Sequence, residues 1–181
     1  MAEGQFTFAR FYERRARRIF PALFAVLAVT LAAGYFLLLP SDYAATLRAA
    51  LGTLFFSSNL VFWREMQAGY FAATDAKLNP LLHTWSLAVE EQFYVFFPIL
   101  LLVCYRYCRK HIFWILLGCA LVSLGGAALL VKSKVVAVFF LSPFRAWELL
   151  AGSMLAFGYV PAVRSRVVRE VLVAGGLLAI V

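Results

Sequence analysis

The sequence predicts an all-α integral membrane protein, a helical bundle with four to five membrane segments. Of its 181 residues, 64% are hydrophobic and 14% are charged, whereas soluble domains are about 45–50% apolar and about 25% charged. Long apolar runs alternate with short clusters of Arg and Lys, and the net charge is +8. Apolar runs of this length indicate a multi-pass membrane protein and argue against a soluble helical core.

The apolar runs and the helix-start signals set the elements in order. The first run, residues 19–39, is about 31 Å long as a helix, enough to cross the hydrocarbon core. The second is weaker, because it contains Arg48 and the polar cluster 57–59. Asn79-Pro80 and Ser142-Pro143 each place Pro after a capping residue, which predicts helices from 79 to about 105 and from 142 to about 157. The expected membrane segments are 19–39, 43–63, 84–105, 112–131 and 137–158, with a further one starting at 171–181.

The basic clusters predict the topology. Residues 10–18, 106–110 and 164–169 should all be cytoplasmic, and residues 132–136 should face the other side. An even number of crossings must then separate the first two clusters, so 43–63 would be a non-crossing or re-entrant element, with residues 40–84 on the outer side. If 43–63 spans instead, one cluster breaks the positive-inside rule. The sequence leaves both alternatives open.

Charge and cysteine usage exclude some kinds of site. The Arg and Lys residues lie between apolar runs, which favours a bilayer over nucleic acid as the partner. Cys104, Cys108 and Cys119 lie in or beside apolar segments and are interpreted as small apolar side chains. We expect no metal site and no disulfide framework.

Polar residues on the predicted helix 84–105 are the main candidates for chemistry. His83, Ser86, Glu90 and Tyr94 recur at helical spacing and so share one face, whereas Glu91 and Gln92 point elsewhere. A polar stripe on an apolar helix should face the bundle interior or a wet cavity. It would form either a buried network that joins helices or a pocket in which His83 or Glu90 orients or deprotonates a hydroxyl. Glu90 is favoured because it lies deeper in the membrane.

Two further charged groups are candidates for substrate binding. Arg145 and Glu148 either pair with each other at i, i+3, or Arg145 reaches Glu90 across the bundle. Near the N-terminus, Arg14, Arg15 and Arg18 fall on shared helical faces and suit bidentate phosphate contacts. Anionic lipid headgroups, or topology alone, would also explain this basic segment.

These elements resemble the acyltransferase-3 family of bacterial membrane O-acyltransferases. The resemblance runs from about residue 4 to residue 157. It is carried by FYERRARRIFPAL at 11–23, SSNLVFW at 57–63, NPLLHTWSLAVEEQFYVFFP at 79–98 and SPFRAWELLAG at 142–152. It implies a multi-pass protein of the bacterial inner (plasma) membrane. The implied reaction moves an acyl group, usually acetyl, from acyl-CoA to a hydroxyl of a surface carbohydrate such as lipopolysaccharide O-antigen, peptidoglycan or exopolysaccharide.

The resemblance also implies residue roles. Arg15 and Arg18 match the family's Arg-x-x-Arg motif and would contact the CoA phosphates. Glu90, rather than Glu91, matches the acidic position of the Trp-x-Leu-x-x-Glu-x-x-Phe-Tyr motif. Acyl-CoA would be a substrate and no cofactor would be bound.

The chain departs from the family pattern at its start. The family begins with two further membrane helices, the first carrying a His taken as the catalytic base, and nothing here aligns with them. His83 belongs to a different motif. The chain is therefore expected to be an internal fragment, truncated at both ends, and the full protein can append an SGNH-type domain. The alternatives are a membrane transporter or flippase, or a non-catalytic fragment.

Overall fold

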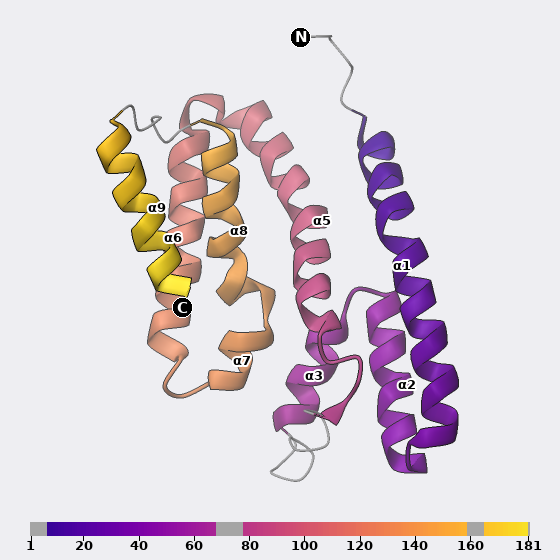
Figure 1. Ribbon diagram of the computed structural model, residues 1–181. Coiled ribbons are helices and arrows are strands. Elements are labelled where there is room, and N and C mark those ends of the chain that lie inside the picture. The colour runs from indigo at the N-terminus through magenta and orange to yellow at the C-terminus, as the bar shows by residue number, and fades with distance from the viewer. Residues whose placement is uncertain (1–6, 68–77, 159–164, 181) are drawn as a thin grey trace.

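The computed structural model describes residues 7–67, 78–158 and 165–180, and these form an all-helical membrane bundle (Figure 1). Within these residues, four helical stretches are long and apolar enough to cross a membrane: Phe8–Leu37, Thr84–Tyr107, Arg109–Leu130 and Val135–Ala156. The predicted fold class is confirmed. The helices are α1 (Phe8–Leu37), α2 (Pro40–Leu54), α3 (Ser58–Gln67), α5 (Thr84–Tyr107), η1 (Arg109–His111), α6 (Ile112–Leu130), α7 (Val135–Phe140), α8 (Ser142–Ala156) and α9 (Arg166–Ile180).

The first helix is longer than its apolar run. The expected segment began at residue 19, but α1 begins at Phe8 and continues through Pro21. The basic residues from Arg10 onward and the apolar run therefore form one continuous helix. Because Arg15 and the apolar run belong to one helix, the side of the helix on which Arg15 lies is fixed relative to the apolar residues that follow it.

The weak segment 43–63 is not a span but two half-length helices. α2 ends at Leu54 and α3 begins at Ser58, and the turn between them is closed by hydrogen bonds from Ser57 N to Gly52 O at 2.7 Å and from Phe56 N to Thr53 O at 3.1 Å. In Figure 1, α2 rises from the bottom to mid-height beside α1, and α3 descends again. Two short helices that turn back at mid-height are the arrangement that the re-entrant alternative predicts.

Polar side chains from neighbouring helices form hydrogen bonds to the backbone and side chains at the break between α2 and α3. Asn59 is fully buried and donates to Phe140 O at 3.1 Å. Gln92 Nε2 of α5 donates to Phe56 O at 2.8 Å and to Asn59 Oδ1 at 2.9 Å, while Ser142 donates to Gln92 Oε1. Irregular backbone at membrane depth is tolerated only where other protein groups or water satisfy it. The network of Asn59, Gln92 and Ser142 meets that condition.

The second half of the bundle is built from α5, α6 and α8. Its core consists of Leu116, Ala120 and Leu150. Ser123 on α6 joins it to the start of α8, because its hydroxyl donates to Pro143 O at 2.6 Å and accepts from Trp147 N at 3.1 Å. Ser142-Pro143 opens α8 as expected, but α5 begins at Thr84 rather than near Asn79, whose side chain caps a turn ahead of it through Leu81 N at 3.0 Å.

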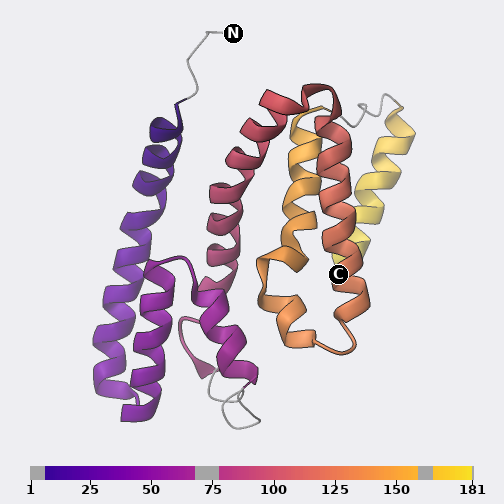
Figure 2. The same ribbon diagram turned by 180° about the vertical axis from the view of Figure 1, so that it is seen from behind.

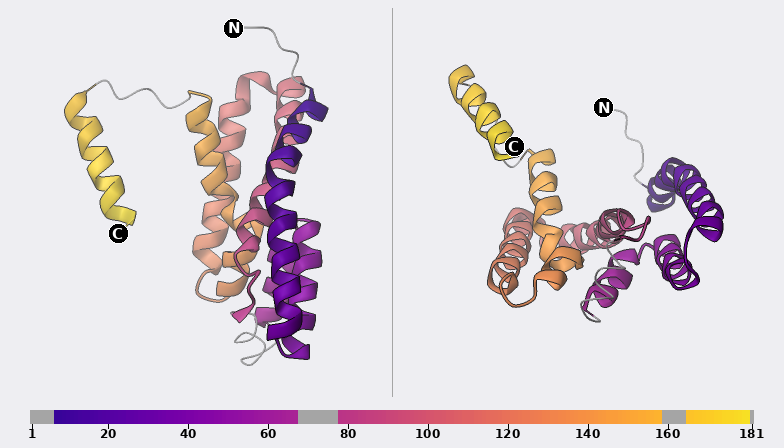
Figure 3. Two further views of the ribbon diagram at one scale, coloured as in Figure 1. Left: turned by 45° about the vertical axis from the view of Figure 1, so that its right-hand side comes forward. Right: turned by 60° about the horizontal axis from the view of Figure 1, so that its bottom comes forward.

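The basic clusters lie at one end of the bundle. The start of α1 and the end of α5 are both at the top of Figures 1 and 2, and the loop holding Lys132 and Lys134 is at the bottom. This matches the pattern expected from the charges. Seen along the bundle in Figure 3, the helices form an open arc from α8 and α6 through α5 and α3 to α2 and α1, and α9 stands apart.

Candidate functional site

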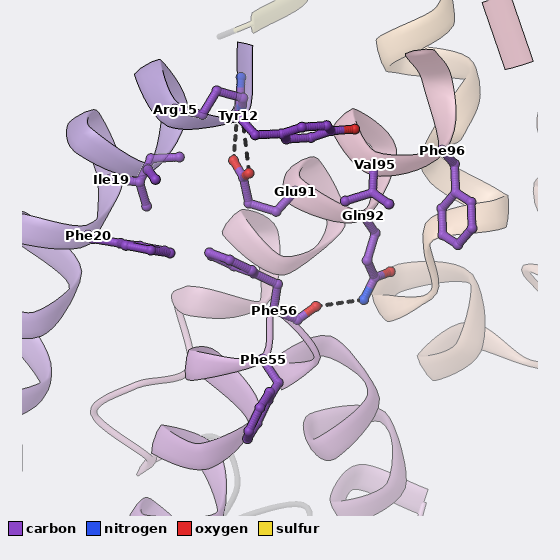
Figure 4. A pocket seen from close by; sticks show the side chains of 11 residues that line it. Tyr12, Arg15, Ile19, Phe20, Phe55, Phe56, Glu91, Gln92, Val95 and Phe96 are labelled. Atoms are coloured by element: carbon purple, nitrogen blue, oxygen red, sulfur yellow. Dashed lines mark hydrogen bonds and ion pairs between the residues drawn. The ribbon is translucent and has the colours of Figure 1, made fainter. Parts of the chain in front are cut away.

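A cavity of about 300 Å³ lies between α1, α5 and the turn that joins α2 to α3 (Figure 4). It is lined by Tyr12, Arg15, Ala16, Ile19, Phe20, Phe55, Phe56, Glu91, Gln92, Val95 and Phe96. Three segments far apart in the sequence therefore meet here. Most of these side chains are apolar, but the cavity also holds one ionic pair.

The ionic pair joins Arg15 of α1 to Glu91 of α5. The guanidinium contacts the carboxylate through two atoms: Nη2 donates to Oε1, and Nε donates to Oε2 at 3.3 Å. The side chains are only 23% and 11% exposed. The Arg15 guanidinium also lies 3.4 Å from the centroid of the Tyr94 ring, and Tyr12 donates to Tyr94 O at 3.2 Å. The carboxylate and the aromatic ring fix the planar guanidinium at the cavity wall.

The apolar side of the cavity ends at two phenylalanines. The rings of Phe20 and Phe56 are nearly parallel, with centroids 6.2 Å apart and planes 14° apart, and Figure 4 shows them side by side below the ionic pair. Phe56 has a positive φ of 49°, a backbone conformation uncommon for a bulky residue. The hydrogen bond from Gln92 to Phe56 O holds this turn in place.

The arrangement offers a cationic donor beside an apolar space. A fixed guanidinium can stabilise negative charge that develops on a carbonyl oxygen, and it does so most strongly where water is excluded. Glu91 accepts the hydrogen bonds of this cation, so its first role is to position Arg15. The cavity as a whole suits a ligand with an apolar part next to a polarisable carbonyl or an anionic group.

The structure brings some of the predicted site residues together. Arg15 lines the cavity and contacts Tyr94, which lies outside the lining, whereas Arg14 and Arg18 are exposed on α1. Arg17, between them, forms an exposed ion pair with Glu13 at 2.8 Å. Arg15 and Arg18 thus belong to one sequence motif but lie in different environments.

Most of the expected polar face of α5 is not in the interior. His83, Ser86 and Glu90 do share a face, but all three are exposed among the described residues, and it is Glu91 that is buried. Successive residues on a helix are turned by about 100°, and α1 packs on the side of Glu91. Tyr94, the fourth residue of the expected face, is half-buried and contacts Arg15. The described helices thus enclose only the Tyr94 end of this face, and a wet cavity at Glu90 stays a prediction.

Arg145 and Glu148 pair with each other. Arg145 Nη2 contacts Glu148 Oε1 at 2.9 Å, and its guanidinium lies 5.2 Å from the Trp85 ring. The i, i+3 alternative is the one found, and the expectation that Arg145 reaches Glu90 is not met. Arg145 and Glu148 stand away from the cavity lining, on the side of the bundle formed by α7 and α8.

Of the residues that line the cavity, sequence reasoning identified only Arg15 as a site residue. Glu91 and Gln92 were set aside because they leave the face of Glu90, and Phe56 carries no chemical signal. The one available hint was that Glu91 and Gln92 are polar residues in a membrane helix and so need partners of their own. Their partners lie 76 and 33 or more residues away in sequence, at Arg15, Asn59 and Phe56, and only the fold brings them close.

Comparison with known proteins places the chain in a family. The family model described as "Acyltransferase domain" matches residues 1–181. A Haemophilus influenzae protein named "Uncharacterized protein" is 32% identical over 85% of this chain and 64% of its own length. A putative O-acetyltransferase of Staphylococcus aureus strain COL is 34% identical over 83% of this chain and 25% of its own length.

A second named relative supports the same assignment. The S. aureus O-acetyltransferase OatA is 30% identical over 94% of this chain and 28% of its own length. The chain thus spans about two thirds of the first relative and about a quarter of the two Staphylococcus proteins. No solved structure matches. Since the family model covers every residue, the chain belongs to the acyltransferase-3 family of membrane proteins.

Proposed function

We propose that the protein is an O-acyltransferase of the bacterial inner membrane. It takes an acyl group, normally acetyl, from acyl-CoA at the basic end of the bundle, taken as cytoplasmic, and transfers it to a hydroxyl of an extracytoplasmic or cell-surface carbohydrate. The observation that carries this proposal is the cavity in which the fixed Arg15 guanidinium borders an apolar space. The relatives named as O-acetyltransferases support the type of reaction.

In this proposal, α1 contacts the donor at two places, the CoA phosphates and the thioester. Its start carries exposed Arg14 and Arg18, which suit the phosphates of CoA. Arg15, on the same helix, faces the cavity instead. A donor bound with its phosphates on the exposed arginines would direct its thioester towards Arg15. Anionic lipid headgroups would satisfy Arg14 and Arg18 equally well, so the cavity, rather than the basic segment, is the specific feature.

The chemistry is a balanced acyl transfer. The acceptor hydroxyl oxygen attacks the thioester carbonyl carbon, and its proton passes to a base. The C–S bond breaks, CoA leaves as a thiolate that takes up a proton, and an ester C–O bond replaces the thioester. Arg15 would stabilise the tetrahedral oxyanion. His83 and Glu90, with Ser86 on the same exposed face of α5, remain the candidates for orienting the acceptor and accepting its proton.

Removal of the Arg15 side chain tests the proposal. In membrane vesicles supplied with acetyl-CoA and surface glycan, Arg15→Ala should lower acetyl transfer about 100-fold, the usual loss when one oxyanion donor is removed. Arg17→Ala, two positions along the same helix and paired only with Glu13 at the surface, should retain it. Wild-type transfer by Arg15→Ala at equal membrane abundance contradicts the role given to this guanidinium.

The broken pair α2–α3 favours a second candidate, a transporter or flippase, because discontinuous helices commonly form substrate paths in transporters. The two candidates differ in what happens to the substrate. An acyltransferase releases free CoA with each acyl group moved, and a transporter moves its substrate unmodified. Transport of an unacylated glycan, with no CoA released, would favour the second candidate.

A further inference from the structure

We propose that the cavity is the acyl pocket of the donor site, and that the stacked pair of Phe20 and Phe56 sets the longest acyl group it accepts. This inference rests on the proposed acyltransferase function and adds its substrate selectivity. It concerns the apolar side of the cavity, which the transfer step itself does not use. Three observations carry it: the size of the cavity, the separation of its charged and apolar parts, and the way its floor is held.

The cavity is larger than an acetyl group requires. Its volume of about 300 Å³ corresponds to about ten water-sized groups at about 30 Å³ each, whereas an acetyl group has three non-hydrogen atoms. Even with part of the pantetheine arm inside, space is left over for additional methylenes. The lining also includes Ile19, Val95 and Phe96, whose side chains offer no hydrogen bonds and therefore suit a hydrocarbon chain.

The charged and apolar parts are arranged as a thioester with an alkyl tail would need. Arg15 and Glu91 lie together on one side, and the two phenylalanine rings lie side by side below them (Figure 4). A carbonyl oxygen directed at the guanidinium would leave its alkyl chain pointing towards the rings. Each methylene buried there is worth about a four-fold gain in affinity, which is about 0.8 kcal/mol.

The floor is held by the rest of the fold. Phe56 lies in the break between α2 and α3, and Gln92 fixes its carbonyl at 2.8 Å. Gln92 in turn bonds to the fully buried Asn59 at 2.9 Å. Phe20 comes from a different helix and stacks on Phe56 at 6.2 Å. Phe56 is thus tied to buried polar groups, and Phe20, which is 39% exposed, packs against this fixed ring. We infer that the fixed position of Phe56 is what lets the floor measure chain length.

Two substitutions change the depth of the pocket in opposite directions. Phe20→Ala removes one half of the floor, and Ala16→Phe adds a ring to the lining one helical turn nearer the basic end. Each has a matched control on the exposed surface of the same helix: Phe36→Ala for the first and Ala25→Phe for the second. Neither control residue belongs to the lining.

The measurement is release of CoA from acetyl-, butyryl- and octanoyl-CoA by membrane vesicles containing each variant, with surface glycan as acceptor. Phe20→Ala should raise the ratio of octanoyl to acetyl transfer about ten-fold, the effect of accommodating about two further methylenes. Ala16→Phe should lower the butyryl to acetyl ratio by a similar factor. Both controls should keep the wild-type ratios.

The outcomes separate this inference from the proposed function. If acetyl transfer persists but neither Phe20→Ala nor Ala16→Phe changes the ratios, the pocket does not measure acyl length and only the transferase proposal stands. If the wild type releases no CoA from any acyl-CoA, the transferase proposal fails and the inference with it. Extra phospholipid co-purifying with Phe20→Ala, with unchanged ratios, would overturn the acyl pocket in favour of a lipid-tail groove.

Discussion

At the scale of single residues, two adjacent carboxylates on α5 have opposite surroundings. Glu91 is buried and bonded to Arg15, whereas Glu90 is exposed on the face that also carries His83 and Ser86. A charge at membrane depth is costly unless it is paired or hydrated. Glu91 meets this requirement through its pairing, and its carboxylate is thereby occupied. Glu90 is the carboxylate of the two that is accessible to an acceptor.

Neutralising these two carboxylates should have different effects. Glu91→Gln leaves the Arg15 cation without its counter-charge and should reduce the free energy of unfolding by about 3 kcal/mol, the lower part of the range for a broken buried pair. Glu90→Gln should leave stability within about 0.5 kcal/mol, as for other surface changes, but should reduce acyl transfer. Thermal unfolding of the detergent-solubilised protein and CoA release measure the two effects.

A double variant separates the two roles of the ionic pair. Replacing both partners, as Arg15→Met with Glu91→Leu, should recover much of the stability lost in Glu91→Gln, because apolar pairs of similar size can replace buried ion pairs without loss. Transfer should stay low, since the guanidinium is gone. Recovery of transfer in the double variant would mean that the pair serves the fold alone.

The sequence could predict which residue types matter here but not which carboxylate is enclosed. Helical spacing correctly placed His83, Ser86 and Glu90 on one face. Which face of α5 packs inward depends on where α1 lies, and that contact joins Arg15 to Glu91 across 76 positions of sequence. No local pattern contains this information. The role of Glu90 itself stays a prediction.

At the scale of elements, the re-entrant pair α2–α3 depends on close packing at Gly52. A Cβ at this position would lie 2.8 Å from Val61 Cγ2 and 3.1 Å from the backbone Cα of Ser58. A side chain on Gly52 would therefore push α3 away from α2. This would also disturb Phe56, because the turn between the two helices is closed by the hydrogen bond from Ser57 N to Gly52 O.

Gly52→Ala should destabilise the protein by about 1–3 kcal/mol, the cost of overpacking a tight contact. Gly118→Ala, at a position of α6 where a Cβ would meet nothing within 4 Å, should be neutral or stabilising by up to about 1 kcal/mol through helix propensity. Thermal unfolding midpoints of the two variants provide the comparison. A loss for Gly118→Ala as large as that for Gly52→Ala would show that the effect is not steric.

The long elements followed from sequence because their cause is local. An apolar run of sufficient length must form a helix to satisfy its backbone in lipid, so α5, α6 and α8 lie close to where they were expected. The start of α1 did not follow from hydrophobicity, since the helix continues outward through Arg10 to Arg18. The break near Ser57 was indicated only indirectly. The positive-inside rule requires an even number of crossings between the first two basic clusters, and this suggested that 43–63 does not span.

At the scale of the whole molecule, the basic ends of α1 and α5 mark one side of the membrane. Cys108 is exposed beside Arg109 at this end, and Ser133 is exposed between Lys132 and Lys134 at the other. The positive-inside rule predicts that the end with Cys108 is cytoplasmic. The orientation can therefore be tested with a single added cysteine.

A membrane-impermeant maleimide applied to intact cells should label Ser133→Cys and leave Cys108 unlabelled until the membrane is permeabilised. Cys119→Ala removes the other exposed cysteine and serves as the background for both measurements. Labelling of Cys108 and Ser133→Cys from the same side would contradict the arrangement of the crossings between them. If only Cys108 is labelled in intact cells, the orientation is the opposite of the predicted one, with the end that carries Cys108 on the outside.

Because α2 ends at Leu54, it does not continue through the space occupied by the cavity. With 15 residues in α2 and 10 in α3, the two helices rise only about 22 and about 15 Å, so neither is long enough to cross a hydrocarbon core of about 30 Å. The cavity above the turn between them occupies depth that a complete helix would have filled. In the proposed transfer, a donor entering from the basic end and an acceptor entering from the other end would each cover only part of the membrane thickness before they meet.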